Sequence, residues 1–166
     1  MVTDLVTGGD LRYHICKNKK FSEDQTKFFV ACCLIGLEYM HNNGVIHRDI
    51  KPGNVLIYVD PNTRQITMKL ADFGLSKSVN ERGSYTMKSG VKGTNTWLAP
   101  ELLRKLMENE KKLGRGTVKS DVFALSLVFA YLLLKGLHLY GSDEIEIINN
   151  IVADRQVNIS SKFSTW

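Results

Sequence analysis

The chain has 166 residues, which is enough for one domain with a buried core. Hydrophobic residues make up 43% and charged residues 23% of the sequence, as in ordinary globular proteins. The formal net charge of +5 is modest, and no basic run interleaved with aromatic residues predicts a nucleic-acid site.

The cysteines and the apolar runs exclude two further classes. Cys16, Cys32 and Cys33 have neither CxxC nor Cys/His spacing, which argues against a zinc site and favours free thiols in a reducing compartment. The longest apolar run, Val122 to Leu134, is shorter than the roughly 20 residues that a bilayer span needs. We therefore expect a buried core helix there, no membrane segment in this chain, and no signal peptide.

The first third of the chain predicts helices. Residues 1–6 are typical of the end of a buried strand, and a short helix is expected from about Asp10. Ser22 and Gln25 form a capping-box pattern, which predicts a long helix that ends near Gly44. The apolar residues of this helix predict one wide, deeply buried stripe. They are Phe28, Phe29, Cys32, Cys33, Ile35, Leu37, Tyr39 and Met40.

The remainder predicts a hairpin, two loops and two helices. Val55–Val59 and Ile66–Leu70 are rich in β-branched and aromatic residues and flank a turn at Asp60-Pro61-Asn62. Residues 76–96 have no periodicity and exceed the usual connection length, which indicates a functional loop. A charged, exposed loop is expected at 108–119, a core helix from Asp121 to Leu134, and an amphipathic helix at 143–152. The expected fold class is α+β, mainly helical.

Candidate catalytic residues lie in His47-Arg48-Asp49-Ile50-Lys51-Pro52-Gly53-Asn54. Asp49 can accept a hydroxyl proton, and extended backbone would point Lys51 to the same side. A tight turn at Pro52-Gly53 would then present Asn54, a neutral oxygen ligand suited to Mg²⁺.

A second motif, Asp72-Phe73-Gly74, follows the returning strand of the hairpin. The Asp72 carboxylate would add a second oxygen ligand for a hard cation such as Mg²⁺. Asn54 and Asp72 are expected to face each other across the hairpin.

Together with Gly93–Glu101, which ends in A-P-E, these motifs resemble the eukaryotic protein kinases. The resemblance implies that residues 1–166 form a partial kinase domain, from the hinge through the region after the central helix, with an activation segment at 72–101. This corresponds to the kinase C-terminal lobe, with the N-terminal lobe absent. The isolated chain is accordingly expected to have little or no activity.

The same resemblance implies residue roles. Asp49 would accept the substrate proton, Lys51 would offset charge on the γ-phosphate, and Thr94 would bridge the two. Lys51 and Thr94 resemble serine/threonine rather than tyrosine kinases, so the expected partner is a protein with a Ser or Thr acceptor. ATP and Mg²⁺ are the expected cofactors, with Asn54 and Asp72 as metal ligands.

The nucleotide-binding and bracing roles rest on the resemblance alone. Thr3 would be the gatekeeper, and the backbones of Asp4 and Val6 would bind adenine. Asp10 would bind the ribose, Leu56 would form the floor under the base, and Lys51 would contact phosphate. Asp121 would brace the backbone of the catalytic loop from the start of the central helix.

The resemblance also implies a regulatory role for Arg48, which precedes the catalytic Asp. In kinases with this arginine, the cation often pairs with a phosphorylated residue of the activation segment. Ser84, Thr86 and Ser89 are the candidate acceptors, and we expect self-association with trans-autophosphorylation there.

Two segments narrow the resemblance. Ser84–Glu101 and Gly136–Gly141 are similar to the inositol-requiring transmembrane kinase/endoribonucleases of the unfolded-protein response. This implies a cytosol-facing or cytoplasmic domain whose parent is anchored in the endoplasmic reticulum membrane. Two alternatives to a protein kinase stay open: a nucleotide-sensing switch that gates an attached endoribonuclease, and a non-catalytic interaction module.

Overall fold

The computed structural model describes residues 6, 8–17, 21–87, 90–108 and 115–159. The strand expected at residues 1–6 therefore lies almost entirely outside the described residues. So do three residues assigned roles from the sequence, Thr3, Asp4 and Ser89.

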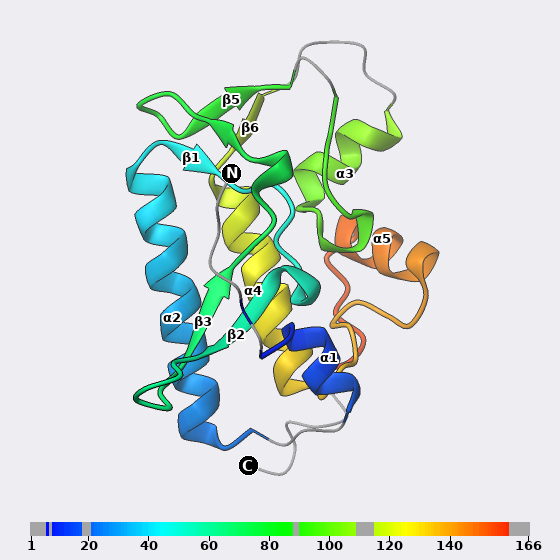
Figure 1. Cartoon of the computed structure of the whole chain (residues 1–166). Coiled ribbons are helices and arrows are strands. Elements are labelled where there is room, and N and C mark those ends of the chain that lie inside the picture. The colour runs from blue at the N-terminus through cyan, green and yellow to red at the C-terminus, as the bar shows by residue number, and fades with distance from the viewer. Residues whose placement is uncertain (1–5, 7, 18–20, 88–89, 109–114, 160–166) are drawn as a thin grey trace.

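Helices dominate the described chain (Figure 1). They are α1 (Leu11–Cys16), α2 (Glu23–Asn42), α3 (Pro100–Met107), α4 (Lys119–Leu133) and α5 (Glu144–Val152). Short 3₁₀ turns lie at η1 (Pro52–Asn54), η2 (Phe73–Leu75) and η3 (Asn95–Trp97). Helices α2 and α4 run side by side behind a β-hairpin, whereas α3 and α5 pack together on the other side of α4.

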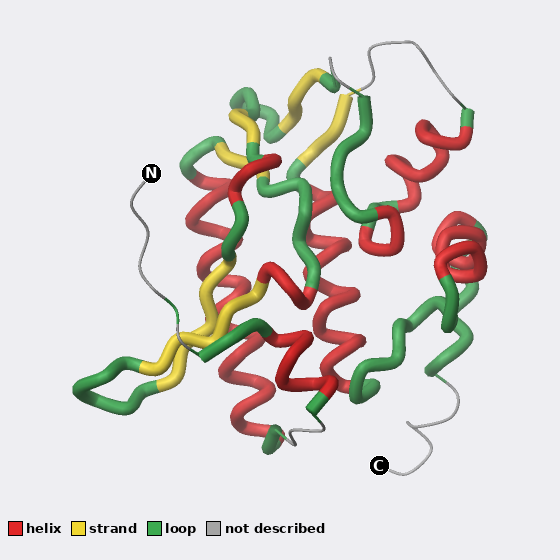
Figure 2. Tube along the Cα trace, turned by 45° about the vertical axis from the view of Figure 1, so that its right-hand side comes forward, coloured by secondary structure: helices red, strands yellow, loops and turns green. Residues whose placement is uncertain are grey.

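The strands form small antiparallel pairs. Strand β2 (Val55–Val59) pairs with β3 (Ile66–Leu70), β1 (Val45–Ile46) with β4 (Lys77–Ser78), and β5 (Ser84–Thr86) with β6 (Arg115–Thr117). The β2–β3 hairpin was predicted and is confirmed; Figure 2 shows its turn projecting from the helical body. Helices with small sheets agree with the expected α+β class.

The ends of α2 agree with the capping pattern. The Ser22 hydroxyl accepts from the Gln25 backbone N–H, and the Gln25 side chain accepts from Ser22 N, so two of the unpaired donors of the first turn are satisfied. Gly44 follows the helix with a φ of 69°, the left-handed conformation predicted for it.

The wide buried stripe predicted for α2 is wrong. Phe29, Cys33, Leu37 and Met40 are buried, but Ile35 and Tyr39 are 66% and 71% exposed. Phe28 is also exposed. The strand β3 and helix α4 cover only one face of α2, and the sequence alone does not indicate which apolar residues lie outside that face.

Helix α4 is the central core helix expected from the apolar run. It begins at Lys119, two residues before Asp121, and buries Leu125, Leu127 and Val128. Among the described helices, none is both long and apolar enough to cross a bilayer.

Both loop predictions need correction. The segment 76–96 contains β4, β5 and η3, and the segment 108–119 contains β6, which pairs with β5. Strands of two or three residues are too short to show periodicity. Helix α3 was also not predicted, although Pro100 occupies its first turn, a common position for proline.

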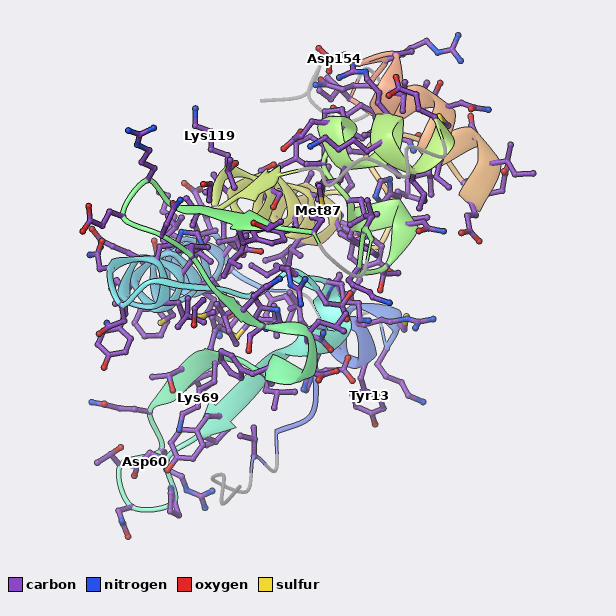
Figure 3. The ribbon with its side chains drawn as sticks, turned by 90° about the horizontal axis from the view of Figure 1, so that it is seen from above. Tyr13, Asp60, Lys69, Met87, Lys119 and Asp154 are labelled. Atoms are coloured by element: carbon purple, nitrogen blue, oxygen red, sulfur yellow. The ribbon has the colours of Figure 1, made fainter. Side chains whose placement is uncertain are left out.

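Two apolar clusters meet along α4. One joins α1, α2, β2 and α4 through residues such as Leu11, Phe29 and Leu125. The other joins α3, α5 and β5 to α4 and includes Met87 and Leu127. Figure 3 shows Met87 near the centre of the molecule and Asp60 at the hairpin tip, away from it. The loop of residues 47–54 lies where these clusters adjoin.

Candidate active site

The backbone of residues 47 and 48 is fixed by a buried carboxylate. Asp121 is 1% exposed; its Oδ2 accepts from His47 N at 2.8 Å, and its Oδ1 accepts from Arg48 N at 2.9 Å. His41 Nε2 lies 3.0 Å from the same Oδ2. Arg48 has a φ of 72°, which is unfavourable for a residue with a side chain, so these bonds hold a strained turn in place.

His47 joins this loop to the end of the hairpin. Its ring is completely buried, and Nδ1 accepts from Asp49 N at 3.3 Å. A neutral ring therefore carries its proton on Nε2, which donates to Ala71 O at 2.9 Å. The His47 ring also packs against Phe73, with centroids 5.1 Å apart, so the two sequence motifs are in direct contact.

Asp49, Lys51 and Thr94 form one hydrogen-bonded group. Lys51 Nζ lies 2.7 Å from Asp49 Oδ2 and donates to Thr94 Oγ1 at 2.9 Å. The Thr94 hydroxyl donates to Asp49 Oδ1 at 2.8 Å, and its backbone N–H donates to the same oxygen at 3.0 Å. Asp49 is 8% exposed, and its two oxygens are held in position by Lys51 of its own loop and by Thr94 from a distant segment.

Asn54 and Asp72 lie at the same end of the hairpin. Asn54 Nδ2 donates to Asp49 O at 2.8 Å and to Asp49 Oδ2 at 3.2 Å, which leaves its Oδ1 as an acceptor. Ala71 N donates to Asn54 O at 2.9 Å and so brings the next residue, Asp72, beside it. Asp72 is exposed, with a φ of 62°, and one of its oxygens accepts from Gly74 N at 3.3 Å.

These oxygens suit a hard cation. Among the described residues, no three His, Cys, Asp or Glu side chains gather as a metal cluster. Mg²⁺ needs no such cluster, because it is usually bound through one or two carboxylates together with substrate phosphates. The Asn54 amide oxygen and the exposed Asp72 carboxylate therefore fit a magnesium–phosphate complex.

The residues expected around adenine and ribose are partly brought together. Asp10 pairs with Leu56 in an isolated bridge, and Ile57 N donates to Gly9 O at 2.9 Å. The Asp10 carboxylate caps α1 by accepting from Tyr13 N at 2.8 Å. Leu56 and Val6 are half-buried.

Comparison with known proteins agrees with this geometry. Residues 1–166 match the family model described as the protein kinase domain. The chain belongs to the protein kinase family. It is 37% identical over 136 residues to the serine/threonine-protein kinase CG17528 of Drosophila melanogaster, covering 82% of this chain and 16% of that protein.

Two further relatives are also kinases. Identity is 41% over 103 residues to the serine/threonine-protein kinase SCH9 of Saccharomyces cerevisiae, covering 62% of this chain and 11% of the relative. Identity is 37% over 153 residues to protein kinase C of Aspergillus fumigatus, and the match covers 92% of this chain and 12% of that protein. This kinase chain thus spans less than a fifth of the length of each of these relatives.

Arg48 of this kinase chain contacts Tyr85, which lies between the candidate acceptors Ser84 and Thr86. Its Nε donates to Leu75 O, and its guanidinium carbon lies 5.3 Å from the Tyr85 ring centroid. Burial raises the pKa of Tyr85, and the positive charge of Arg48 partly opposes this. Side chains alternate along a strand, so Ser84 and Thr86 of β5 are directed to the opposite face from Tyr85.

Sequence reasoning missed His41 and Tyr85. His41 contacts Asp121, which lies 80 positions later in the sequence, and no local sequence pattern predicts such a contact. Tyr85 could have been noticed as an aromatic residue between two polar ones, Ser84 and Thr86, an alternation that is typical of a strand with one buried face.

Proposed function

We propose that this chain is the C-terminal lobe of a serine/threonine protein kinase, with residues 72–101 as its activation segment. The complete kinase would transfer the γ-phosphate of ATP to a Ser or Thr hydroxyl of a protein. The observation that supports this best is the Asp49–Lys51–Thr94 group, in which a carboxylate, a cation and a hydroxyl are mutually hydrogen-bonded beside Asn54.

Each residue has a defined task in this mechanism. The oxygen of the substrate hydroxyl bonds to the γ-phosphorus, its proton passes to Asp49, and ADP leaves. Thr94 and Asn54 fix the two Asp49 oxygens, so the carboxylate does not need to reorganise during transfer. Lys51, 2.7 Å from Asp49, offsets the negative charge on the transferred group.

The nucleotide complex would be held by the end of the hairpin. Asn54 and Asp72 would bind Mg²⁺, which neutralises the phosphate oxygens when it is bound. Asp10 would contact the ribose, and Leu56 would pack under the adenine, with backbone contacts from Asp4 and Val6.

The test is phosphotransfer to a generic Ser/Thr protein substrate by the protein that carries this chain. Asp49→Asn preserves the shape of the side chain but cannot accept the proton, so we expect a loss of at least about 100-fold. Asp60→Asn, in the exposed hairpin turn (Figure 3), is the matched control and should retain activity. Full activity of Asp49→Asn with a normal melting temperature would contradict the proposal.

A second candidate function is a kinase switch that gates an attached endoribonuclease in the unfolded-protein response, in a protein anchored in the endoplasmic reticulum membrane. It is favoured by the similarity of Ser84–Glu101 and Gly136–Gly141 to that family. Its phosphotransfer would be directed at Ser84, Thr86 or Ser89, for pairing with Arg48. Phosphopeptide mapping of the same reaction distinguishes the two candidates, because only the switch requires these sites to be modified.

A further inference from the structure

A groove of about 520 Å³ lies beside the proposed catalytic group. Its lining includes Lys51 and Thr94 of the catalytic group, Arg12 of α1, and the rings of Trp97 and His138. A hydroxyl presented to Asp49 would therefore carry its neighbouring residues along this groove.

The charged residues in the described lining of the groove are all cations. Of the described residues that line it, Arg12 and Lys51 carry a charge at neutral pH, and none is Asp or Glu. The Lys51 charge is balanced by Asp49, at 2.7 Å. Arg12 is exposed, and no described carboxylate forms an ion pair with it.

The nearby carboxylates are already engaged elsewhere. Glu146, behind the groove residue Ser142, accepts from both the backbone N–H and the hydroxyl of Ser142. Asp10, two positions before Arg12 in the sequence, caps the start of α1 by accepting from Tyr13 N. The Arg12 guanidinium is thus a cation in the lining of the groove that has no counter-ion among the described residues.

His138 is a buried polar residue in the lining of the groove. It is 8% exposed, and its Nδ1 accepts from Tyr140 N, so the neutral ring carries its proton on Nε2. That nitrogen is buried and has no hydrogen-bond partner among the described residues. This nitrogen is not exposed to the groove and the Thr96 backbone acts on the ring, so it is the Arg12 cation that favours a ligand rich in acceptor oxygens.

We propose that this groove selects substrate segments that carry an anionic side chain, a carboxylate or a phosphate, close to the acceptor hydroxyl, and that Arg12 is the specificity-determining residue. This proposal rests on the proposed kinase function, because that function makes the ligand of the groove a substrate. The contact it requires is between the Arg12 guanidinium, which presents several N–H donors, and a planar carboxylate or a phosphate.

The experiment measures peptide binding without nucleotide, so that it does not depend on phosphotransfer. Three fluorescent peptides share one sequence with alanine in place of the acceptor, and they carry Asp, phosphoserine or Lys at the flanking positions. Anisotropy at low ionic strength should show tighter binding of the Asp and phosphoserine peptides than of the Lys peptide. A clear preference for phosphoserine over Asp would identify the anion as a phosphate, and equal affinities would identify either anion as sufficient.

Variants of α1 test the role of Arg12. Arg12→Ala should weaken binding of the anionic peptides about two- to fivefold, as for an exposed ion pair, and Arg12→Glu should reverse the preference towards the Lys peptide. Lys17→Ala is the matched control, because Lys17 is an exposed cation directly after α1. Its ammonium lies over the ring of Tyr13, whose side chain points outward in Figure 3. The Arg12 effect should shrink at 0.5 M salt because the charges are screened.

Two results would overturn the proposal: equal losses in Arg12→Ala and Lys17→Ala, or a Lys peptide that binds as tightly as the anionic ones. These outcomes are separate from a failure of the kinase function. If phosphotransfer is absent but Arg12→Glu still reverses the binding preference, the groove is an anionic-peptide site in a chain that does not catalyse.

Discussion

At the scale of single residues, Asp121 is a buried carboxylate with three hydrogen-bond partners. Its carboxylate is almost completely buried and meets two backbone N–H groups, of His47 and Arg48, as well as the His41 ring. The two backbone donors belong to the turn with positive φ that precedes Asp49. The position of the proposed catalytic carboxylate therefore depends on a residue that would itself touch no substrate.

Replacing Asp121 by Asn should destabilise the chain. An amide has one acceptor oxygen and one nitrogen donor, so one of the two backbone N–H groups would face another donor. A buried hydrogen-bonding group without a partner costs about 1–3 kcal/mol, and we expect a loss of this size in the free energy of unfolding. Urea denaturation at pH 7 measures it.

The control for this change is Asp24→Asn. Asp24 is an exposed carboxylate in the first turn of α2, where removal of its charge should cost less than about 1 kcal/mol. If both variants lost the same small amount, the Asp121 contacts would contribute little to stability.

The sequence was most informative about residues that act within short motifs. Asp49, Lys51 and Asn54 could be grouped because extended backbone followed by a tight turn converges their side chains. Thr94 lies 43 residues from Lys51, and only the family resemblance suggested their contact. No sequence pattern predicts the Arg48–Tyr85 contact, which is seen only in the folded structure.

At the scale of elements, prediction succeeded where the signal is local. The caps of α2 and α5 are hydrogen bonds within four residues, and Ser22 and Asp143 both accept from the backbone as their residue types favour. The β5–β6 pair is different. Its two strands come from segments about thirty residues apart in the sequence. Packing of the Tyr85 ring against Gly116, rather than local strand propensity, holds them together.

Gly116→Ala tests this fit. An added Cβ would overlap the Tyr85 ring, which is 6% exposed and is confined by Arg48 and Lys77. Such overpacking typically costs about 1–3 kcal/mol. We expect faster amide hydrogen exchange in Ser84–Thr86, measured by mass spectrometry.

Gly36→Ala is the matched control for this substitution. A Cβ at Gly36 would lie 3.9 Å from Leu70 Cδ1, an ordinary contact, and alanine in the interior of α2 should stabilise the chain by roughly 0.5–1 kcal/mol. Unchanged exchange of β5 in Gly116→Ala would show that Tyr85 adapts and does not hold the strand.

At the scale of the whole molecule, the sequence did not predict which faces of the helices and strands pack against one another. Helices α2, α4 and α5 and the β2–β3 hairpin were predicted, but their relative placement determines what is buried. Tyr39 and Met40 are neighbours on α2, yet one is 71% exposed and the other is buried. The burial of His138 likewise could not be predicted, because it depends on packing against Trp97 of a distant segment.

His138 makes the stability of the molecule sensitive to acid. Burial lowers the pKa of the ring from its ordinary value of 6.5 to about 4, and the backbone of Thr96 opposes this shift to a smaller extent. The ring packs edge-on to Trp97, with centroids 5.0 Å apart, and so joins the loop before α5 to the 3₁₀ turn η3. A charge at this position is disfavoured in the folded state only.

Stability should therefore fall as the pH drops below 6.5. The unfolded chain binds a proton on His138 near pH 6.5, whereas the folded chain does so only near a pKa of about 4, so protons favour unfolding between these values. The loss should reach roughly 2 kcal/mol at pH 5, where most carboxylates are still ionised. Urea denaturation at pH 7 and pH 5 measures this difference, and His138→Leu, which cannot titrate, should remove most of it. A pH dependence as steep in His138→Leu as in the unmodified chain would assign the acid sensitivity to other groups.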